Sequence, residues 1–194
     1  KEKPYTTIFP FESVEAAISN KKEQSPWFQS LNGLWSFKFS YKPADRPIEF
    51  YKEEFNTSTW DLIKVPANWE MEGYDYPIYL DETYPFKAIW PNMQDDYNPV
   101  GSYKRNFTVN QDWLDREVIL HLGAVTSAVY VWVNGREVGY SEESKTPAEF
   151  NITSYLKKGK NSVALEIYRW SDASYIESQD MIRLSGIERD VFLY

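Results

Sequence analysis

The stretch VTSAVYVWVNGREVGYS at residues 125–141 decides the fold of this chain. Residues 128–133 are β-branched and aromatic, Asn134-Gly135 follows directly, and residues 136–140 return. Asn-Gly favours a type I′ turn, whose twist matches that of the two flanking strands. The first arm is apolar on both faces and therefore needs cover on both. This predicts a hairpin at the centre of an antiparallel β-sandwich rather than at its edge.

Strand patterns continue before and after the hairpin. Residues 34–39 alternate Leu, Ser and Lys with Trp, Phe and Phe, which is typical of a half-buried strand. Val163, Leu165 and Ile167 alternate in the same way. Further strands are expected at residues 60–65, 101–109, 117–122 and 148–152 and from Arg189 onward. We expect about nine strands in all. The pattern is that of an all-β, antiparallel sandwich.

Two long irregular segments, residues 73–100 and 171–186, interrupt the strands and are rich in polar and aromatic side chains. Segments of this kind in a compact domain are usually functional, and we expect both on one rim. Residues 1–29 differ again, because Ser13–Asn20 can form a short helix with Ser13 as its N-cap. The expected organisation is an N-terminal arm at 1–29 and one sandwich domain at 30–194.

Composition excludes several functional classes. The net charge of −8 argues against a nucleic-acid partner, and the lack of cysteine excludes disulfides and thiolate zinc sites. No run approaches the roughly 18 apolar residues of a membrane helix. The one histidine, His121, lies between Leu120 and Leu122 on an expected strand, which predicts a structural role and leaves no Ser-His-Asp system.

Carboxylates gather in and after the second irregular segment. They are Asp172, Glu177, Asp180 and Asp190, beside Arg169, Arg183 and Arg189, and Glu142-Glu143 could join them. Two interpretations stay open, a salt-bridged or solvated loop and a rim that binds a hard cation or sugar hydroxyls. A glycosidase pair also stays open, because the sequence does not give the separation of two carboxylates. The rings of Trp90, Tyr84, Tyr97 and Tyr79 could stack on a sugar or pack the loop down.

Six stretches together resemble the N-terminal sugar-binding domain of family 2 β-galactosidases, the large bacterial lactose-hydrolysing type. They are SLNGLWSF at 30–37, VPANWEMEGYDYPIY at 65–79, TYPF at 83–86, NPVGSYKRNF at 98–107, AVTSAVYVWVNGREVGYSEESKTPAEFNIT at 124–153 and RWSDASYIESQDMIRLSGIERDVFL at 169–193. The hairpin alone is similar to the wider family, which includes glucuronidases and mannosidases. Two other stretches are more specific and resemble the galactosidase branch: QDMIRLSGIERDV after RWSDASY, and NWEMEGYDYPIY.

The resemblance implies a jelly-roll, galactose-binding-domain-like β-sandwich with long rim loops and a short N-terminal helical arm. It also implies a (β/α)₈ barrel elsewhere in the polypeptide that carries both catalytic glutamates, so no catalytic residue is expected in this chain. The parent enzyme would be a retaining β-galactosidase that releases terminal β-D-galactosyl residues. Two other functions remain open: a free-standing carbohydrate-binding module, and a sandwich that serves only structure or oligomerisation.

The resemblance also implies roles for individual residues. Asp81 and Asp180 would face the substrate, and Asp180 would bind Na⁺ or K⁺ together with ligands from the barrel. The family often has Asn in the place of Asp81, and an ionised Asp only accepts hydrogen bonds. Asp172 and Glu142 would help hold Mg²⁺ in the full enzyme, while the isolated domain would carry no cofactor.

The implied partners are the catalytic barrel and other domains of the same polypeptide, a galactoside substrate, and further copies in a homo-oligomer. Neither nucleic acid nor a membrane is an expected partner. The implied location is the cytoplasm or periplasm of a bacterium.

Overall fold

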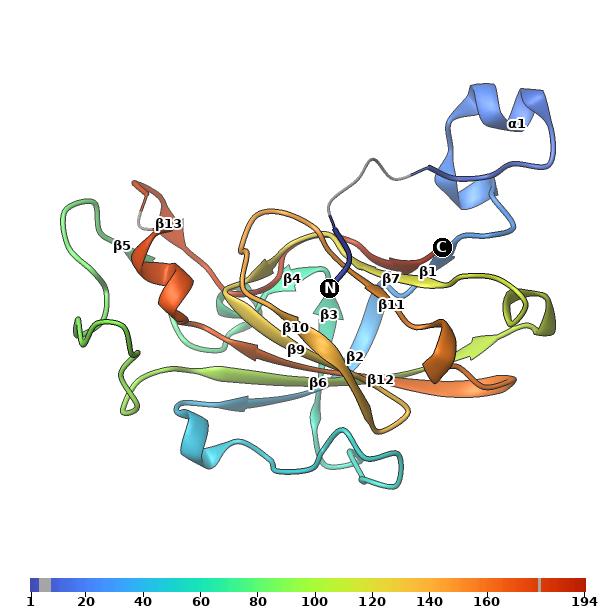
Figure 1. Ribbon diagram of the computed structural model, residues 1–194. Coiled ribbons are helices and arrows are strands. Elements are labelled where there is room, and N and C mark those ends of the chain that lie inside the picture. Colours follow the sequence, from blue (N-terminus) through green and yellow to red (C-terminus); the bar gives the residue numbers. More distant parts are fainter. Residues whose placement is uncertain (4–7, 178) are drawn as a thin grey trace.

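Two antiparallel sheets lie face to face in the computed structural model, which describes residues 1–3, 8–177 and 179–194 (Figure 1). The larger sheet has the order β10 (Arg136–Ser141), β9 (Ala128–Val133), β12 (Gly159–Tyr168), β6 (Val100–Val109), β2 (Gly33–Ser40) and β3 (Asp61–Val65). The smaller sheet has the order β1 (Gln29–Ser30), β15 (Val191–Leu193), β7 (Ile119–Leu122) and β11 (Ala148–Asn151). The prediction of an all-β antiparallel sandwich is confirmed.

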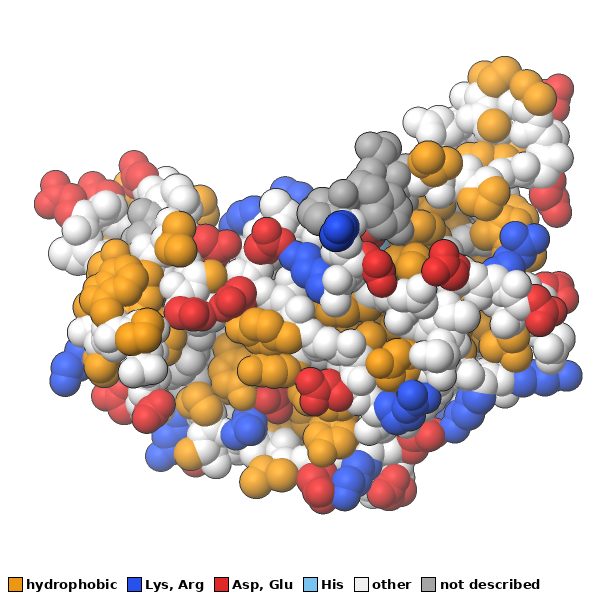
Figure 2. All heavy atoms as spheres, in the orientation of Figure 1, with side chains coloured by type: hydrophobic (Ala, Val, Ile, Leu, Met, Phe, Trp, Pro, Cys, Tyr) orange, Lys and Arg blue, Asp and Glu red, His pale blue; other side chains and the backbone are white. Residues whose placement is uncertain are grey.

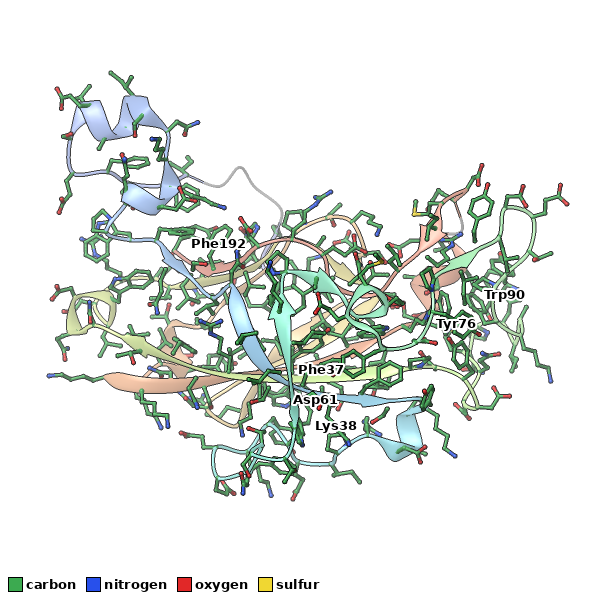
Figure 3. All side chains as sticks on the ribbon, turned by 180° about the vertical axis from the view of Figure 1, so that it is seen from behind. Phe37, Lys38, Asp61, Tyr76, Trp90 and Phe192 are labelled. Carbon is green, nitrogen blue, oxygen red and sulfur yellow. The ribbon has the colours of Figure 1, made fainter. Side chains whose placement is uncertain are left out.

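The core fills the space between these sheets. Val163, Leu165 and Ile167 on β12 are at most 1% exposed, as their alternation predicted. Phe37 on β2, labelled in Figure 3, is fully buried in the same layer. The smaller sheet contributes the buried side chains Leu120, Leu122, Phe150, Val191 and Leu193. Each large apolar side chain buried in this way contributes roughly 1.5–3 kcal/mol, so this layer is the main source of stability.

The predicted hairpin is present and its turn has the expected geometry. Asn134 and Gly135 have φ angles of 51° and 77°, and Arg136 pairs with Val133 across the turn. These positive φ values are those of a type I′ turn, which explains why Asn and Gly occupy the two positions. The sequence therefore predicted β9 and β10 correctly.

The position predicted for the hairpin in the sheet is wrong. β10 is the edge strand of the larger sheet, and β9 is second from the edge. The outward ring of Trp132 on β9 is covered by the loop that precedes β3: Tyr51 stacks on it at 5.0 Å between ring centroids. Tyr130, the other outward ring, is 36% exposed. A loop supplies the cover that the sequence pattern suggested would come from another layer of the sandwich.

The N-terminal arm contains the predicted helix. α1 spans Val14–Ser19, and the Ser13 hydroxyl caps it by accepting a hydrogen bond from the amide of Ala16 at 3.1 Å. The rings of Phe9 and Phe28 connect the arm to the sandwich through Phe192 of β15, with centroids 5.8 and 5.1 Å from the Phe192 ring.

Short elements complete the described part of the chain. The 3₁₀ turns are η1 (Lys22–Gln24), η2 (Pro43–Asp45), η3 (Trp69–Glu72), η4 (Gln111–Trp113), η5 (Thr153–Tyr155) and η6 (Asp172–Tyr175). The short strands are β4 (Ala67–Asn68), β5 (Ile78–Tyr79), β8 (Val125–Thr126), β13 (Ile182–Arg183) and β14 (Gly186–Ile187). The described residues thus form 15 strands rather than about nine, because two-residue strands leave no periodic pattern in a sequence. In the part of the chain that is described, no helix has the length and apolar character needed to cross a membrane.

Candidate functional site

A short ribbon at one end of the sandwich joins the two irregular segments. β5 lies in the first segment and β13 in the second, and they pair antiparallel with Tyr79 opposite Ile182 and Ile78 opposite Arg183. Figure 1 shows this ribbon projecting at the end of the molecule opposite α1. The two insertions therefore meet on one rim, as the sequence predicted.

Asp81 and Asp180, the two residues expected to face a sugar, both lie at this ribbon. Asp81 follows β5 by two residues and Asp180 precedes β13 by two residues, so the antiparallel register places them at the same end of the ribbon. Both side chains are exposed. The Tyr79 hydroxyl donates a hydrogen bond of 2.7 Å to Oδ1 of Asp180. This bond with the Asp180 carboxylate raises the pKa of Tyr79.

A buried arginine fixes the chain just before the ribbon. Arg169, at the end of β12, is 0% exposed and forms ion pairs with Asp75 and, at 3.6 Å, with Glu70. Its guanidinium also donates hydrogen bonds of 3.0 Å to the Tyr76 carbonyl and the Tyr97 hydroxyl. Burial raises the pKa of Glu70, while Arg169 lowers it in part. These contacts tie the start of the first irregular segment to the central sheet.

Sequence reasoning missed the partners of Arg169 by grouping it with the carboxylates of the second irregular segment. A signal for its burial was present, because Arg169 has the same strand parity as Leu165 and Ile167, which point into the core. A buried arginine requires buried acceptors. Asp75 and Glu70, in a stretch that precedes β5, supply them.

Glu142 and Asp172 form a second carboxylate pair, beside β10 and η6. The carboxyl groups of the two residues lie near enough to interact, and the Tyr140 hydroxyl donates to Oε2 of Glu142 at 3.1 Å. Burial, followed by the contact with Asp172, raises the pKa of Glu142. Two adjacent carboxylates provide the hard oxygen ligands that a divalent cation prefers, so the donor chemistry of the pair fits Mg²⁺. Among the described residues there is no group of three or more acidic, His or Cys side chains arranged to hold a metal.

The other carboxylates of the second irregular segment have structural partners. Glu177 accepts hydrogen bonds from the backbone amide and the hydroxyl of Ser144. Asp190 pairs with Lys22 at 2.8 Å, and this contact lowers the pKa of Asp190. The acidic residues therefore do not form one rim. Asp180 lies on the ribbon, Asp172 lies beside Glu142, and the remaining two hold loops in place.

The aromatic candidates also divide into two groups. Tyr84 donates a hydrogen bond of 3.3 Å to the Tyr175 carbonyl, and the Tyr97 hydroxyl accepts one of 3.0 Å from Arg169, so both hold the first irregular segment down. Trp90 stacks on Tyr175 with ring centroids 3.7 Å apart but stays 60% exposed, and Tyr79 is 58% exposed. Figure 3 shows Trp90 and Tyr76 at the end of the molecule that carries the ribbon.

Large apolar side chains of the two irregular segments are exposed. They are Tyr76, Tyr79, Leu80, Ile89, Trp90, Ile176 and Ile182, and Ile176 is 82% exposed. Figure 2 shows hydrophobic side chains gathered at this end, with acidic groups at its tip. A contiguous exposed apolar patch with polar groups at its margin is typical of an interaction surface.

His121 has the structural role predicted for it. Its ring is 8% exposed, stacks on Phe192 with centroids 4.2 Å apart, and places Nδ1 2.7 Å from Oε1 of Glu149. It lies on β7 of the smaller sheet, away from the β5–β13 ribbon.

Comparison with known proteins defines the family. The family described as glycosyl hydrolases family 2, sugar binding domain, matches residues 28–194. The chain belongs to this family. A β-galactosidase of Priestia megaterium is 48% identical over the whole chain, and one of Clostridium acetobutylicum is 44% identical over 89% of it. The chain spans 19% and 20% of the length of these two relatives. The resemblance to the sugar-binding domain of family 2 β-galactosidases is therefore confirmed.

Solved structures of family 2 enzymes share the fold. A β-glucuronidase of Bacteroides uniformis is 25% identical to this family 2 domain, with a TM-score of 0.65 over 86% of the chain and 17% of its own length. A structure of β-glucuronidase 2 of that organism, with a covalently bound cyclophellitol-6-carboxylate aziridine, is 26% identical with a TM-score of 0.63. The sandwich is thus shared by family members whose names specify different sugars.

Proposed function

We propose that this family 2 domain forms one wall of the galactose subsite of a retaining β-galactosidase. The catalytic (β/α)₈ barrel, with its two carboxylates, would belong to another part of the same polypeptide. The observation that carries the proposal is the β5–β13 ribbon, which brings Asp81 and Asp180 from two distant insertions to one exposed end. The names of the two relatives reported above support galactose as the sugar.

The chemistry of the ribbon suits a sugar that is also contacted from another side. Ionised Asp81 and Asp180 accept hydrogen bonds from hydroxyl groups, which a galactosyl unit offers in several directions. Both carboxylates are exposed, so they do not enclose a ligand by themselves. The apolar side chains around them, including Trp90 and Ile182, supply a surface on which the barrel would pack.

Two cation sites form part of the proposal for the full enzyme. Asp180 would bind Na⁺ or K⁺ with further ligands from the barrel, and the ion would supply positive charge beside the sugar hydroxyls. Glu142 and Asp172 would bind Mg²⁺, which would neutralise two adjacent carboxylates. The full enzyme would form a homo-oligomer.

The proposal is tested by Asp180→Ala in the full-length enzyme. Loss of a hydrogen bond to a charged group is worth about 1.5–3 kcal/mol, so we expect kcat/KM for a galactoside to fall roughly 10- to 100-fold. The loss should lie mainly in kcat, because contacts to sugar hydroxyls strengthen in the transition state. Asp115→Ala, which removes an exposed carboxylate between β6 and β7, is the matched control and should retain normal activity.

Two outcomes would contradict the proposal. Normal turnover by Asp180→Ala would leave the domain with a structural or oligomerisation role only. Binding of galactose by the isolated 194-residue chain at millimolar affinity or tighter, measured by calorimetry, would instead indicate a carbohydrate-binding module that needs no barrel. We expect no measurable binding by the isolated chain, because half of the pocket lies outside it.

A further inference from the structure

The hydroxyl of Tyr79 contacts the carboxylate that the proposed function assigns to the sugar and the alkali-metal ion. The distance from this hydroxyl to Oδ1 of Asp180 is 2.7 Å, and the two residues are 101 positions apart in the chain. The contact spans the ribbon and links the two irregular segments through side chains as well as through the backbone pairing of Tyr79 with Ile182.

Tyr79 is the better anchored of the two residues. The carbonyl of Tyr76, three residues earlier, accepts a hydrogen bond of 3.0 Å from the buried guanidinium of Arg169. Ile78, immediately before Tyr79, packs against the cluster of Phe86, Trp170 and Tyr175. The backbone that carries Tyr79 is therefore tied to the sandwich, while Asp180 is exposed at the start of the opposite strand.

A fixed donor on one carboxylate oxygen limits how the whole group can rotate. The terminal torsion of an aspartate is broad, so an exposed aspartate without such a donor samples many orientations. With Oδ1 held by the Tyr79 hydroxyl, Oδ2 is presented along one direction. Outer partners of this kind orient ligating carboxylates in metal sites, and their loss lowers affinity or activity.

We propose that Tyr79 is a positioning residue for the sugar and cation subsite, and that it acts by orienting the carboxylate of Asp180. The inference rests on the proposed function of Asp180. It assigns Tyr79 no direct contact with the sugar, so its whole effect should pass through Asp180.

The test is Tyr79→Phe in the full-length enzyme, with Tyr41→Phe as the matched control. Tyr79 and Tyr41 are 58% and 64% exposed, and both substitutions keep the ring and remove only the hydroxyl. We expect Tyr79→Phe to raise the Na⁺ concentration for half-maximal activity, and to lower kcat/KM for a galactoside, by about 3- to 10-fold. Tyr41→Phe should change neither quantity. The thermal midpoints of both variants should match that of the unmodified enzyme, because each hydroxyl lies on an exposed ring.

A double-mutant cycle separates positioning from other roles. In an Asp180→Ala background, Tyr79→Phe should have no further effect, because the carboxylate that it orients is gone. If Tyr79→Phe still lowers kcat/KM there, Tyr79 acts by another route and the inference is wrong. If Asp180→Ala is impaired while Tyr79→Phe behaves like Tyr41→Phe, the inference fails and the proposed function stands. If Asp180→Ala itself turns over normally, both fail.

Discussion

Replacing Arg169 with methionine should destabilise the domain strongly, because this substitution leaves two buried carboxylates without their cation. The side chains of Arg169, Asp75 and Glu70 are 0%, 1% and 0% exposed, so water cannot replace the missing guanidinium. Removing one partner of a buried ion pair costs roughly 3–5 kcal/mol, because it leaves an unpaired buried charge. For a domain of this size each kcal/mol lowers the thermal midpoint by about 2–4 °C, so Arg169→Met should lower it by about 6–20 °C.

The loss of stability caused by Arg169→Met should also depend on pH, and the direction of this dependence follows from the pKa of Glu70. Burial already raises the pKa of Glu70, and Arg169 opposes that rise. In Arg169→Met the pKa of Glu70 should rise further, so the folded variant binds this proton more tightly than the unfolded chain does. The stability that this group contributes is then present at low pH and is lost as pH rises through its folded-state pKa. The difference between variant and unmodified domain should therefore be smaller at about pH 5 than at about pH 7.5.

The measurement is urea unfolding of the 194-residue chain, followed by tryptophan fluorescence at both pH values. Arg136→Met is the control, since it makes the same substitution at an exposed arginine on β10 and should change the free energy of unfolding by less than about 1 kcal/mol. Equal destabilisation by the two substitutions would refute the reasoning. A penalty from Arg169→Met that grows toward acid pH would refute the role given to Glu70.

Four further predictions concern packing, backbone and charge. Val131 is fully buried on β9, so Val131→Ala should lower the free energy of unfolding by about 2–3 kcal/mol. Val14 on α1 is 69% exposed, so Val14→Ala should lower it by less than about 0.5 kcal/mol. Urea unfolding measures both. Gly101→Ala would place its Cβ 2.7 Å from the buried ring of Trp69, and a thermal melt should show a loss of about 1–3 kcal/mol. Gly135 has a φ of 77°, so Gly135→Val should cost about 1–2 kcal/mol and Gly135→Asn less; equal losses would contradict the turn assignment. Burial and Asp172 raise the pKa of Glu142, so in metal-free buffer Glu142→Gln should stabilise the domain at about pH 8 and lose that advantage at about pH 4, as followed by thermal melts.

The features that the sequence predicts well are those set by neighbouring residues. The Asn134-Gly135 turn, the inward alternation of Val163 and Leu165, and the Ser13 cap of α1 all depend on residues within a few positions of each other. Turn chemistry, strand periodicity and helix capping each require particular side chains at fixed spacing. These signals suffice for an all-β sandwich with a short helical arm.

The edge position of the hairpin lies beyond such signals. A strand that is apolar on both faces needs cover, but the pattern does not say what covers it. Here the loop before β3 places Tyr51 against Trp132 with their ring planes 8° apart, and this contact joins residues that no local rule connects. An aromatic side chain covered by a loop and one covered by a second sheet produce the same sequence pattern.

The same limit applies to the candidate site, because its contacts join residues that are far apart in the sequence. Family resemblance identified Asp81, Asp180, Asp172 and Glu142, but the residues alone could not say which carboxylates meet. The fold places Asp81 and Asp180 together on the ribbon and Asp172 next to Glu142, and it gives Asp190 a lysine partner instead. Which acid meets which cation is decided by the register of strands that begin far apart in the chain.

The contrast between buried and exposed charged side chains explains why this domain would form only one part of a sugar-binding site. The side chains of Arg169 and Asp75 are buried and paired with each other before the ribbon begins, whereas Asp81 and Asp180 are exposed at its end. Two exposed carboxylates compete poorly with water for a neutral sugar, because each hydrogen bond made to the sugar replaces one already made to solvent. The same carboxylates become effective when an apolar surface closes over the site and removes that solvent. Trp90 and Ile182 are exposed apolar side chains that could pack against such a surface, so under the proposed function the domain should gain its affinity for galactose only when it is joined to the rest of the enzyme.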